Sequence, residues 1–207
     1  MSAVAICNTA LAHLGHAARI TSVSPPDGSR EADLCAQFYP EALSALYESD
    51  YPWSWTVRTA LLVPVLGEDV AAWRFAYLRP LDARTVFQVA PEGAVTSYRS
   101  DPYAIEKGSS GDLLIRADTP EAWARFTVSE SNTALFSASF RFALSLLLAS
   151  LLAGPLVKGA AAIRVAEALN RRAVQAVAAA RAHDANRASS QPDSSRDFEP
   201  ESFGARS

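Results

Sequence analysis

The chain changes its hydrophobic period twice, and this change is what most constrains its fold. Apolar residues recur every three or four positions near the N-terminus and again after Ser137, which is the spacing of amphipathic helices. From Thr56 to Val128 the apolar runs are short and are broken by glycine, proline and aspartate, as in antiparallel strands. We predict an α+β protein: an antiparallel helical bundle of about four helices, with an inserted small antiparallel β-sheet region and an extended C-terminal tail.

The predicted organisation divides the chain into four segments. Residues 1–55 form the N-terminal helices of the bundle, 56–135 the β-rich insertion, 136–189 the C-terminal helices of the bundle, and 190–207 the tail. The helices and sheet should therefore come from separate stretches of the chain.

Capping and breaking residues set the expected bounds of the elements. Ser29 is a candidate N-cap for the second helix, and Pro40 either kinks that helix or begins another. The helices are expected at Ser2–Leu14, from Ser29 onward, at Ser139–Ala153 and at Ala160–Ser189. The strands are expected at "TALLVPV", "RTVFQV", "YAIEK", "DLLIR" and "ARFTV", with a hairpin turn at Lys107–Asp112.

Charge and cysteine usage exclude some classes of protein. The formal net charge of −3 argues against a dedicated nucleic-acid binder, which usually carries a basic face. Cys7 and Cys35 are too few for a disulfide framework, and each lies among apolar residues at helical spacing. We expect them to be small buried hydrophobic residues of a protein assembled in a reducing cytoplasm.

One apolar run is a candidate membrane segment. Residues 142–157 are shorter than the roughly 20 residues that a transmembrane helix needs. Gly154 and Pro155 lie near the end of the run, and Arg141 and Lys158 flank it. We expect a helix buried on all sides in a larger assembly rather than a membrane span.

Two of the four tryptophans, Trp53 and Trp55, are one residue apart where a predicted helix meets the predicted sheet. A strand would place both rings on one face, whereas a helix would separate them. They are either core anchors between helix and sheet or part of a surface that meets another protein, since tryptophan is enriched in interface anchors. With Trp73 they are candidate helix–sheet or subunit contacts.

The last predicted helix has an apolar stripe composed mostly of alanine. About 30 residues at 1.5 Å per residue give a length of about 45 Å, and such a stripe buries little area. We expect lateral packing against neighbouring subunits, so Ala173→Glu should block assembly of the subunits and leave the monomer folded. The stripe comprises Ala162, Ala166, Leu169, Ala173, Ala176, Val177 and Ala180, of which Ala166, Ala173 and Ala180 are candidate contacts.

We find no set of residues that indicates catalysis, and we predict no catalytic, cofactor or metal site. His13 and His16 have no obvious third and fourth metal ligands. Neither a Gly-x-Ser-x-Gly motif nor a cysteine with a matching histidine is present. The paired acids Glu48 and Asp50 are explained by solvation, and Glu167 and Asp184 are expected on the surface of the last helix.

The C-terminal tail has a composition typical of disorder, yet it contains two aromatic residues. Phe198 and Phe203 are five positions apart in a polar, proline-containing segment, where a solvated linker would not need them. They occur either by chance or as anchors of a tail that becomes ordered on a partner. Arg196 and Asp197 would then contribute polar contacts.

Five stretches of the chain occur in a characteristic order. They are "FYPEALSALYESDYPWSWTVRTALL", "WRFAYLRPLDARTVFQV", "YAIEKGSSGDLLIRADTPEAWARFTV", "LFSASFRFALSLLLASLLAGPL" and the helix containing "ARAHDANRAS". In this order they resemble the tail tubular protein A family, the head-to-tail adaptors of short-tailed bacteriophages. The resemblance covers about Asn8 to Ser189, and the chain departs from it at Ser54-Trp55, where Asn-Phe is expected, and at Arg79, a charge before the proline.

The resemblance implies a structural protein of the virion rather than an enzyme. Such an adaptor forms a homo-oligomeric ring, usually of twelve subunits, between the portal protein and the tail nozzle protein. Double-stranded DNA passes through its channel without sequence-specific binding. The implied location is the head–tail junction, after assembly in the host cytoplasm, and Phe198, Phe203, Arg196 and Asp197 are the candidate portal-binding residues.

Other classes of function remain open at this stage. A phage tail-associated hydrolase would need convergent polar groups in a pocket, and a non-ring virion accessory protein would need no lateral contacts. A membrane-interacting protein would use residues 142–157 and would partition into detergent. We expect a protein that has no membrane partner.

Overall fold

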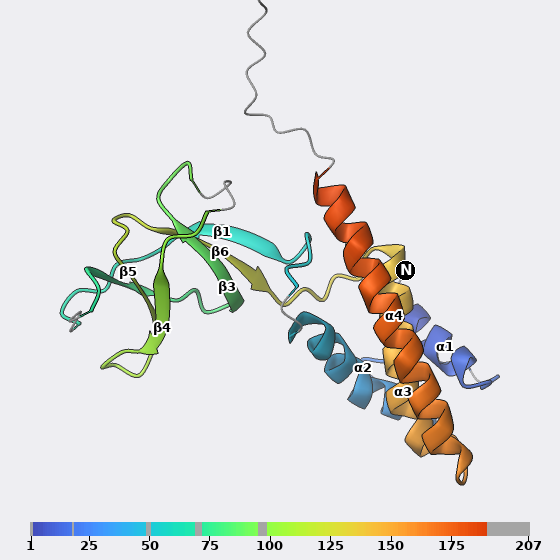
Figure 1. The fold of residues 1–207 in the computed structure, drawn as a ribbon. Helices are drawn as coiled ribbons and strands as arrows, with labels where there is room; N and C mark the ends of the chain where they lie inside the picture. The colour runs from blue at the N-terminus through green and yellow to red at the C-terminus, as the bar shows by residue number, and fades with distance from the viewer. Residues whose placement is uncertain (1, 18, 49–50, 69–71, 95–98, 190–207) are drawn as a thin grey trace, which may run out of the picture.

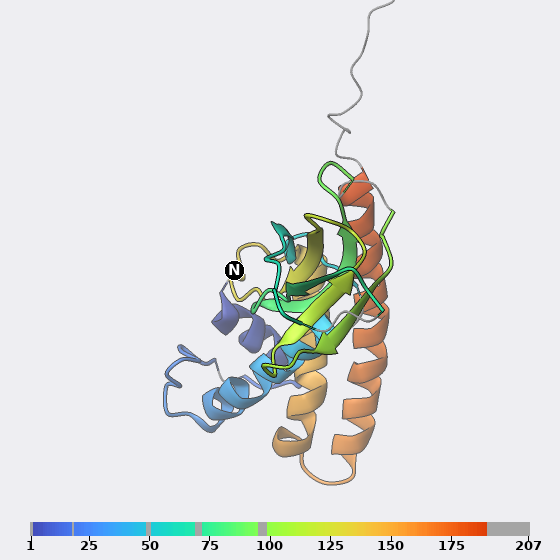
Figure 2. The same ribbon diagram turned by 90° about the vertical axis from the view of Figure 1, so that its left-hand side faces the viewer.

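The computed structural model describes residues 2–17, 19–48, 51–68, 72–94 and 99–189. The fold is α+β, with four helices and two three-stranded antiparallel sheets. The helices gather on one side of the molecule and the strands on the other (Figures 1 and 2). Each side has its own cluster of buried apolar residues, and the two are called here the helical unit and the β-unit.

The helical unit contains α1 (Ala3–His13), α2 (Arg30–Glu48), α3 (Ala138–Leu156) and α4 (Ala161–Ser189). Serine side chains cap three of these helices, because Ser2 Oγ accepts from the Ala5 amide, Ser29 Oγ from the Ala32 amide and Ser137 Oγ from the Phe140 amide. The predicted N-cap of α2 at Ser29 is confirmed. Pro40 lies inside α2 without ending it, so this stretch is one helix.

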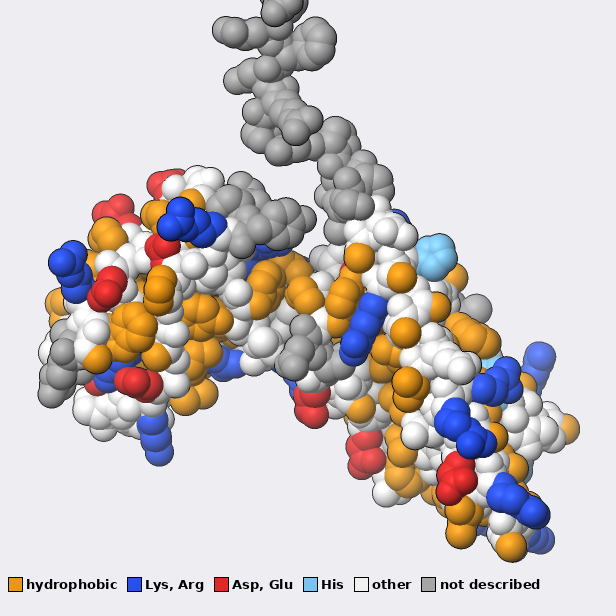
Figure 3. Space-filling view, in the orientation of Figure 1, with side chains coloured by type: hydrophobic (Ala, Val, Ile, Leu, Met, Phe, Trp, Pro, Cys, Tyr) orange, Lys and Arg blue, Asp and Glu red, His pale blue; other side chains and the backbone are white. Residues whose placement is uncertain are grey.

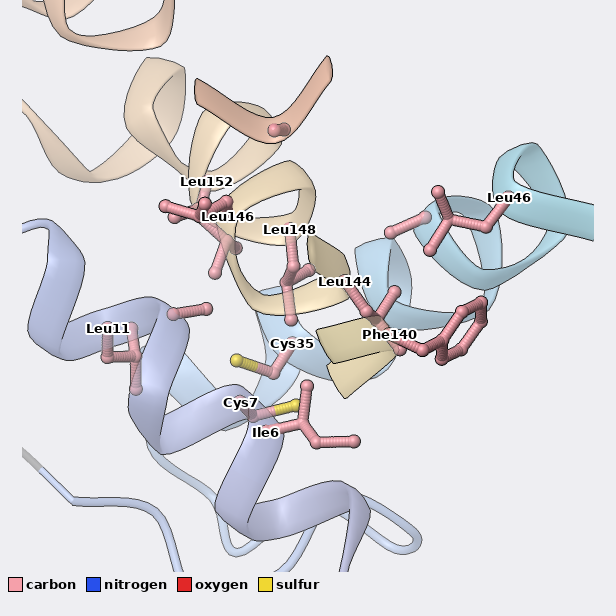
Figure 4. Close-up of a cluster of buried hydrophobic side chains, with 14 of the residues drawn as sticks. Ile6, Cys7, Leu11, Cys35, Leu46, Phe140, Leu144, Leu146, Leu148 and Leu152 are labelled. Carbon is pink, nitrogen blue, oxygen red and sulfur yellow. The ribbon is translucent and has the colours of Figure 1, made fainter. Parts of the chain in front are cut away.

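Helix α3 is the centre of the helical unit and packs against α1, α2 and α4. Its apolar residues are not confined to one stripe, since buried side chains recur in every turn. Helices α1, α2 and α4 bury part of its surface, whereas Phe142 and Leu151 are 47 % and 36 % exposed, so the expected burial on all sides is not met within one chain. Figure 4 shows Ile6, Cys7 and Leu11 of α1, Cys35 and Leu46 of α2, and Phe140, Leu144, Leu146, Leu148 and Leu152 of α3 in this core.

Among the described residues, α3 is also the one helix that is long and apolar enough to cross a membrane. Half of that helix is buried inside the protein. Length and composition do not distinguish the core helix of a soluble protein from a membrane span; within the chain α3 packs against α1, α2 and α4.

The β-unit contains β1 (Val57–Leu61), β2 (Phe75–Leu78), β3 (Ala83–Ala90), β4 (Tyr103–Lys107), β5 (Leu113–Ala117) and β6 (Trp123–Val128). The strand orders are β1-β6-β3 and β2-β5-β4, and all pairs are antiparallel. Side chains of the two sheets share one core, including Tyr77 and Ile115 from one sheet and Val86 and Phe126 from the other. A single sheet was expected; the chain forms two that cover each other.

The segment between β4 and β5 is the predicted hairpin. The Gly108 amide donates to the Asp112 carbonyl at 2.8 Å, and the Gly111 amide donates to the Gly108 carbonyl at 3.0 Å. A Cβ atom at Gly108 would lie 2.6 Å from Leu114 Cδ1 and 3.0 Å from Glu68 Oε1, so a side chain at this position would require the Leu114 and Glu68 side chains to move.

Candidate functional site

The tryptophan pair lies in a turn where the helical unit meets the β-unit. Trp53 is 1 % exposed, and its ring stacks on that of Trp55 with 5.2 Å between the ring centroids. The Thr56 amide donates to the Trp53 carbonyl at 2.8 Å and closes the turn immediately before β1. A tight turn, rather than a strand, places both rings on the same side.

The pair belongs to an aromatic cluster at the N-terminal end of α3. Phe140 makes edge-on contacts with both indoles, at 4.8 Å from Trp53 and 5.0 Å from Trp55. The indole nitrogen of Trp53 donates to the Leu46 carbonyl of α2 at 3.2 Å. Tyr47, Tyr51 and Phe136 complete the cluster. These contacts join the turn before β1 to α2 and α3 within one chain.

Trp73 is not a member of this cluster. It is half-buried in the loop that precedes β2, in the β-unit. The three tryptophans therefore do not form a common surface.

A buried carboxylate on α4 binds the same turn, which precedes β1. Asp184 is 4 % exposed, and it accepts hydrogen bonds from the Ser54 amide at 3.0 Å, the Ser54 hydroxyl at 2.6 Å and the Tyr51 hydroxyl at 3.1 Å. Burial and the neighbouring Asp184 charge raise the pKa of Tyr51 to about 12. The Arg181 guanidinium lies 5.7 Å from the centre of the Tyr51 ring.

The expectation that Asp184 is a surface residue was wrong, whereas Glu167 is exposed as expected. The signal was present in the sequence. Asp184 follows Ala180 by four residues and Val177 by seven, so the helical period continues the alanine stripe onto it. A charged residue at a stripe position indicates a buried polar contact.

We predict that Asp184→Ala lowers the free energy of unfolding by about 1.5–3 kcal/mol, the range for hydrogen bonds to a charged group. The Ser54 amide and hydroxyl would lose their acceptor, whereas the Tyr51 hydroxyl would keep its hydrogen bond to the Arg181 carbonyl. The introduced alanine is itself a good helix former, so α4 loses no helix propensity. Urea unfolding followed by circular dichroism measures the change. Glu167→Ala, on the exposed side of the same helix, is the matched control, and equal effects of the two substitutions would contradict the role of Asp184.

The alanine stripe of α4 packs inside the chain. Leu169, Ala173 and Ala180 are 4 %, 1 % and 0 % exposed, respectively, and belong to the same core as α3. Ala166 is half-buried. The small side chains let α4 lie close along α3, so the buried members of the stripe have no surface left for a neighbouring subunit. The expectation that Ala173→Glu leaves the monomer folded is inconsistent with this burial.

Exposed apolar side chains lie instead on other sides of the two C-terminal helices. Ile163 and Val174 of α4 are 67 % and 63 % exposed, and Phe142 of α3 is 47 % exposed. Figure 3 shows hydrophobic side chains along the outward side of α4, interleaved with basic ones.

The histidines and cysteines do not come together as a metal site. The His13 ring packs edge-on against Phe142, and burial followed by the charge of Arg172 holds the His13 pKa below its usual value. His16 lies 3.8 Å from Glu31. Cys7 and Cys35 are fully buried, and a hydrogen bond between them together with burial raises the pKa of the Cys7 thiol. No group of three metal-ligating side chains occurs in the described parts of the chain.

A shallow groove of about 380 Å³ lies between α2 and β3. Arg84 crosses it and donates to the Ser44 hydroxyl at 2.9 Å, with Glu48 at 3.7 Å. Tyr47 and Thr85 also line it. The lining offers hydrogen-bond donors and one acid, but no nucleophile–base pair; Asp50, the other acid considered from the sequence, is outside the described residues.

An ion cluster that sequence patterns did not indicate lies in the β-unit. Arg116 is 7 % exposed and lies 3.2 Å from Glu68 and 2.8 Å from Glu106. Hydrogen bonds from Ser109 and the Arg116 charge lower the pKa of Glu68. The cluster ties the loop after β1 to the β4–β5 hairpin, which is a structural role.

The candidate portal-binding residues Phe198, Phe203, Arg196 and Asp197 are outside the described residues. No family model matches the chain, and no curated protein matches it either.

Proposed function

We propose that the chain is a head-to-tail adaptor, a structural virion protein that forms a ring between a portal and a tail nozzle. The observation that carries the proposal is the junction at Trp53, Ser54 and Asp184. It joins a helical unit to a separate β-unit and holds the end of α4, from which residues 190–207 continue. This arrangement suits a subunit that contacts different partners through different units.

The surface of the described residues favours assembly over catalysis. Ile163 and Val174 on α4 and Leu61 and Val63 near the end of β1 are more than half exposed, which is suited to burial against other proteins. The net charge of −3 fits a conduit for DNA, because each phosphate neutralised by a basic group adds salt-dependent binding that would slow passage.

The proposal includes finer statements about architecture and assembly. The helical unit is an antiparallel bundle of the kind found in adaptors, and twelve subunits close into the ring. The portal and the nozzle are the protein partners, and the location is the head–tail junction of the virion.

The tail provides the test of this function. Deleting residues 190–207, or replacing Phe198 and Phe203 with serine, is expected to leave rings intact and to weaken their binding to portal rings by at least tenfold. The reason is that two buried phenylalanines each contribute about 1.5–3 kcal/mol, and ring symmetry repeats the contact. Sedimentation of mixtures with portal rings measures the binding.

The matched control replaces Ser194 and Ser195 with alanine, which changes the same segment without removing an apolar anchor. Undiminished portal binding by the phenylalanine variant would assign docking to the folded units. A wild-type chain that never binds portal rings would reject the adaptor function itself.

A further inference from the structure

The two sheets of the β-unit have four edge strands, and two of these edges are covered. The Asp101 amide donates to the Val89 carbonyl along β3. Residues 63–65 run beside β2, where the Val65 amide donates to the Ala76 carbonyl and the Leu78 amide to the Val63 carbonyl. Strand β1 pairs with β6 alone and β4 with β5 alone among the described strands. As far as the described residues go, the outer edges of β1 and β4 are therefore unpaired and could accept a further strand.

The direction of the peptide groups on β1 follows from its pairing. The Leu62 amide donates to the Ala122 carbonyl, and the Val128 amide donates to the Thr56 carbonyl. In an antiparallel ladder, residues whose backbone groups bond to the partner strand alternate with residues whose backbone groups point away from it. The even-numbered residues of β1 therefore bond to β6. The peptide groups of Val57, Thr59 and Leu61 point outward. Among the described residues, their one bonded partner is the Arg58 guanidinium, which donates to the Val57 carbonyl at 3.2 Å.

The same argument applies to β4. The Gly108 amide donates to the Asp112 carbonyl, which places the even-numbered residues toward β5. The peptide groups of Tyr103, Ile105 and Lys107 point outward, and no described residue bonds to them. The outward amides and carbonyls of β4 are thus unpaired among the described residues, and so are those of β1 except the Val57 carbonyl, which accepts from Arg58.

We propose that β1 of one copy of this chain adds antiparallel to β4 of the next copy, so that the two sheets become continuous across the subunit boundary. Val57 then faces Lys107, Thr59 faces Ile105, and Leu61 faces Tyr103, and each pair exchanges backbone hydrogen bonds. This register is the one that uses every outward peptide group of both strands. The inference rests on the proposed ring and names its lateral contact.

Charge complementarity supports pairing of β1 with β4 of a second copy. The register places Arg58 opposite Glu106 in a pair that is not backbone-bonded, where side chains lie closest. Their side chains are 50 % and 52 % exposed, and each keeps a single acid or base of its own subunit nearby, Glu130 at 3.8 Å and Arg116 at 2.8 Å.

Pairing of identical edges lacks this feature. Two β1 strands centred on Thr59 would put Arg58 opposite Ala60, and two β4 strands centred on Ile105 would put Glu106 opposite Ala104. Such pairing also gives a closed two-fold dimer, whereas a contact between unlike edges repeats from one copy to the next, as the proposed ring requires. Charge and symmetry therefore favour the contact between β1 and β4.

Disulfide trapping tests the register. Opposed residues in such a pair have Cα atoms about 4.5 Å apart, which lies within the range that a disulfide spans. Full-length chains carrying Arg58→Cys and Glu106→Cys together, oxidised with diamide at high protein concentration, are expected to give a ladder of covalent oligomers on non-reducing gels. A mixture of the two single variants is expected to give only a covalent dimer. Wild type, whose Cys7 and Cys35 are buried, gives none.

Two matched variants show whether the disulfide cross-linking results from strand addition. Arg58→Cys with Lys107→Cys places the second sulfur on the other face and should cross-link at least tenfold more slowly. Thr59→Pro removes an outward donor that no described residue uses, so it should abolish the ladder without changing the melting temperature, whereas Thr59→Val should not. An absent ladder, or equal cross-linking through position 107, overturns the proposal.

The readouts separate this contact from the adaptor function. Rings that bind portals but cannot be trapped through positions 58 and 106 would reject strand addition and keep the adaptor. A trapped ladder whose rings never bind a portal would keep strand addition and reject the adaptor.

Discussion

Replacing Trp53 with alanine is expected to lower the free energy of unfolding by about 3–5 kcal/mol, the cost of truncating a fully buried aromatic side chain. The indole is 1 % exposed and contacts the rings of Trp55, Tyr51 and Phe140. Its removal leaves a cavity where α2, α3 and the turn before β1 meet. Urea unfolding monitored by circular dichroism measures the loss.

Trp53→Phe is the matched variant, because it keeps an aromatic ring but removes the hydrogen bond to the Leu46 carbonyl. It should cost less than half as much as Trp53→Ala. A shift of the melting temperature by under about 2 °C in Trp53→Ala would reject the anchor role of Trp53 and assign the residue to a surface contact.

The helices could be predicted from the sequence because their signals are local. Ser2 caps α1, and Gly15 follows that helix with a φ of +75°, a backbone conformation that favours glycine. Helix α4 begins at Ala161 and ends at Ser189, within one residue of expectation. Helix α3 was expected to end at Ala153, before Pro155, but it runs to Leu156. Pro155 lies in its last turn and does not end the helix.

The β-unit was harder to predict, since strand pairing is not local. The hairpin of β4 and β5 carries its own turn signal, and both strands were expected. Strand β2, which was not predicted, has four residues and pairs with β5 from almost forty positions away in the chain. No neighbouring residues encode that choice of partner, so the division into two sheets could not be inferred.

The candidate site shows the same limit. Periodicity identified the stripe on α4 that includes Ala173 and Ala180, but a stripe does not say what covers it. Helix α3 covers it, and the alanines allow the close approach of the two helices. Asp184 extends the stripe, yet its hydrogen bonds to Ser54 join residues 130 positions apart in the chain. Contacts at such separations come from the fold and not from local pattern.

Replacing Ala173 with glutamate is expected to destabilise the isolated chain by at least about 3–5 kcal/mol, the cost of a buried charge without a partner. Ala173 is 1 % exposed in the core between α3 and α4, where a larger side chain also forces the helices apart. The loss is a large part of the about 5–15 kcal/mol that stabilises a typical domain. Thermal unfolding of the purified monomer measures it.

Ala179→Glu is the matched control, because Ala179 lies on the exposed side of the same helix. It adds the same charge to α4 without entering the core, and the melting temperature should change little. A normal melting temperature for Ala173→Glu, combined with failure of ring assembly, would show that the alanine stripe lies in the subunit interface. Unfolding of Ala173→Glu alone would instead establish that the alanines build the subunit and that lateral contacts come from other surfaces, among them the open edges of β1 and β4.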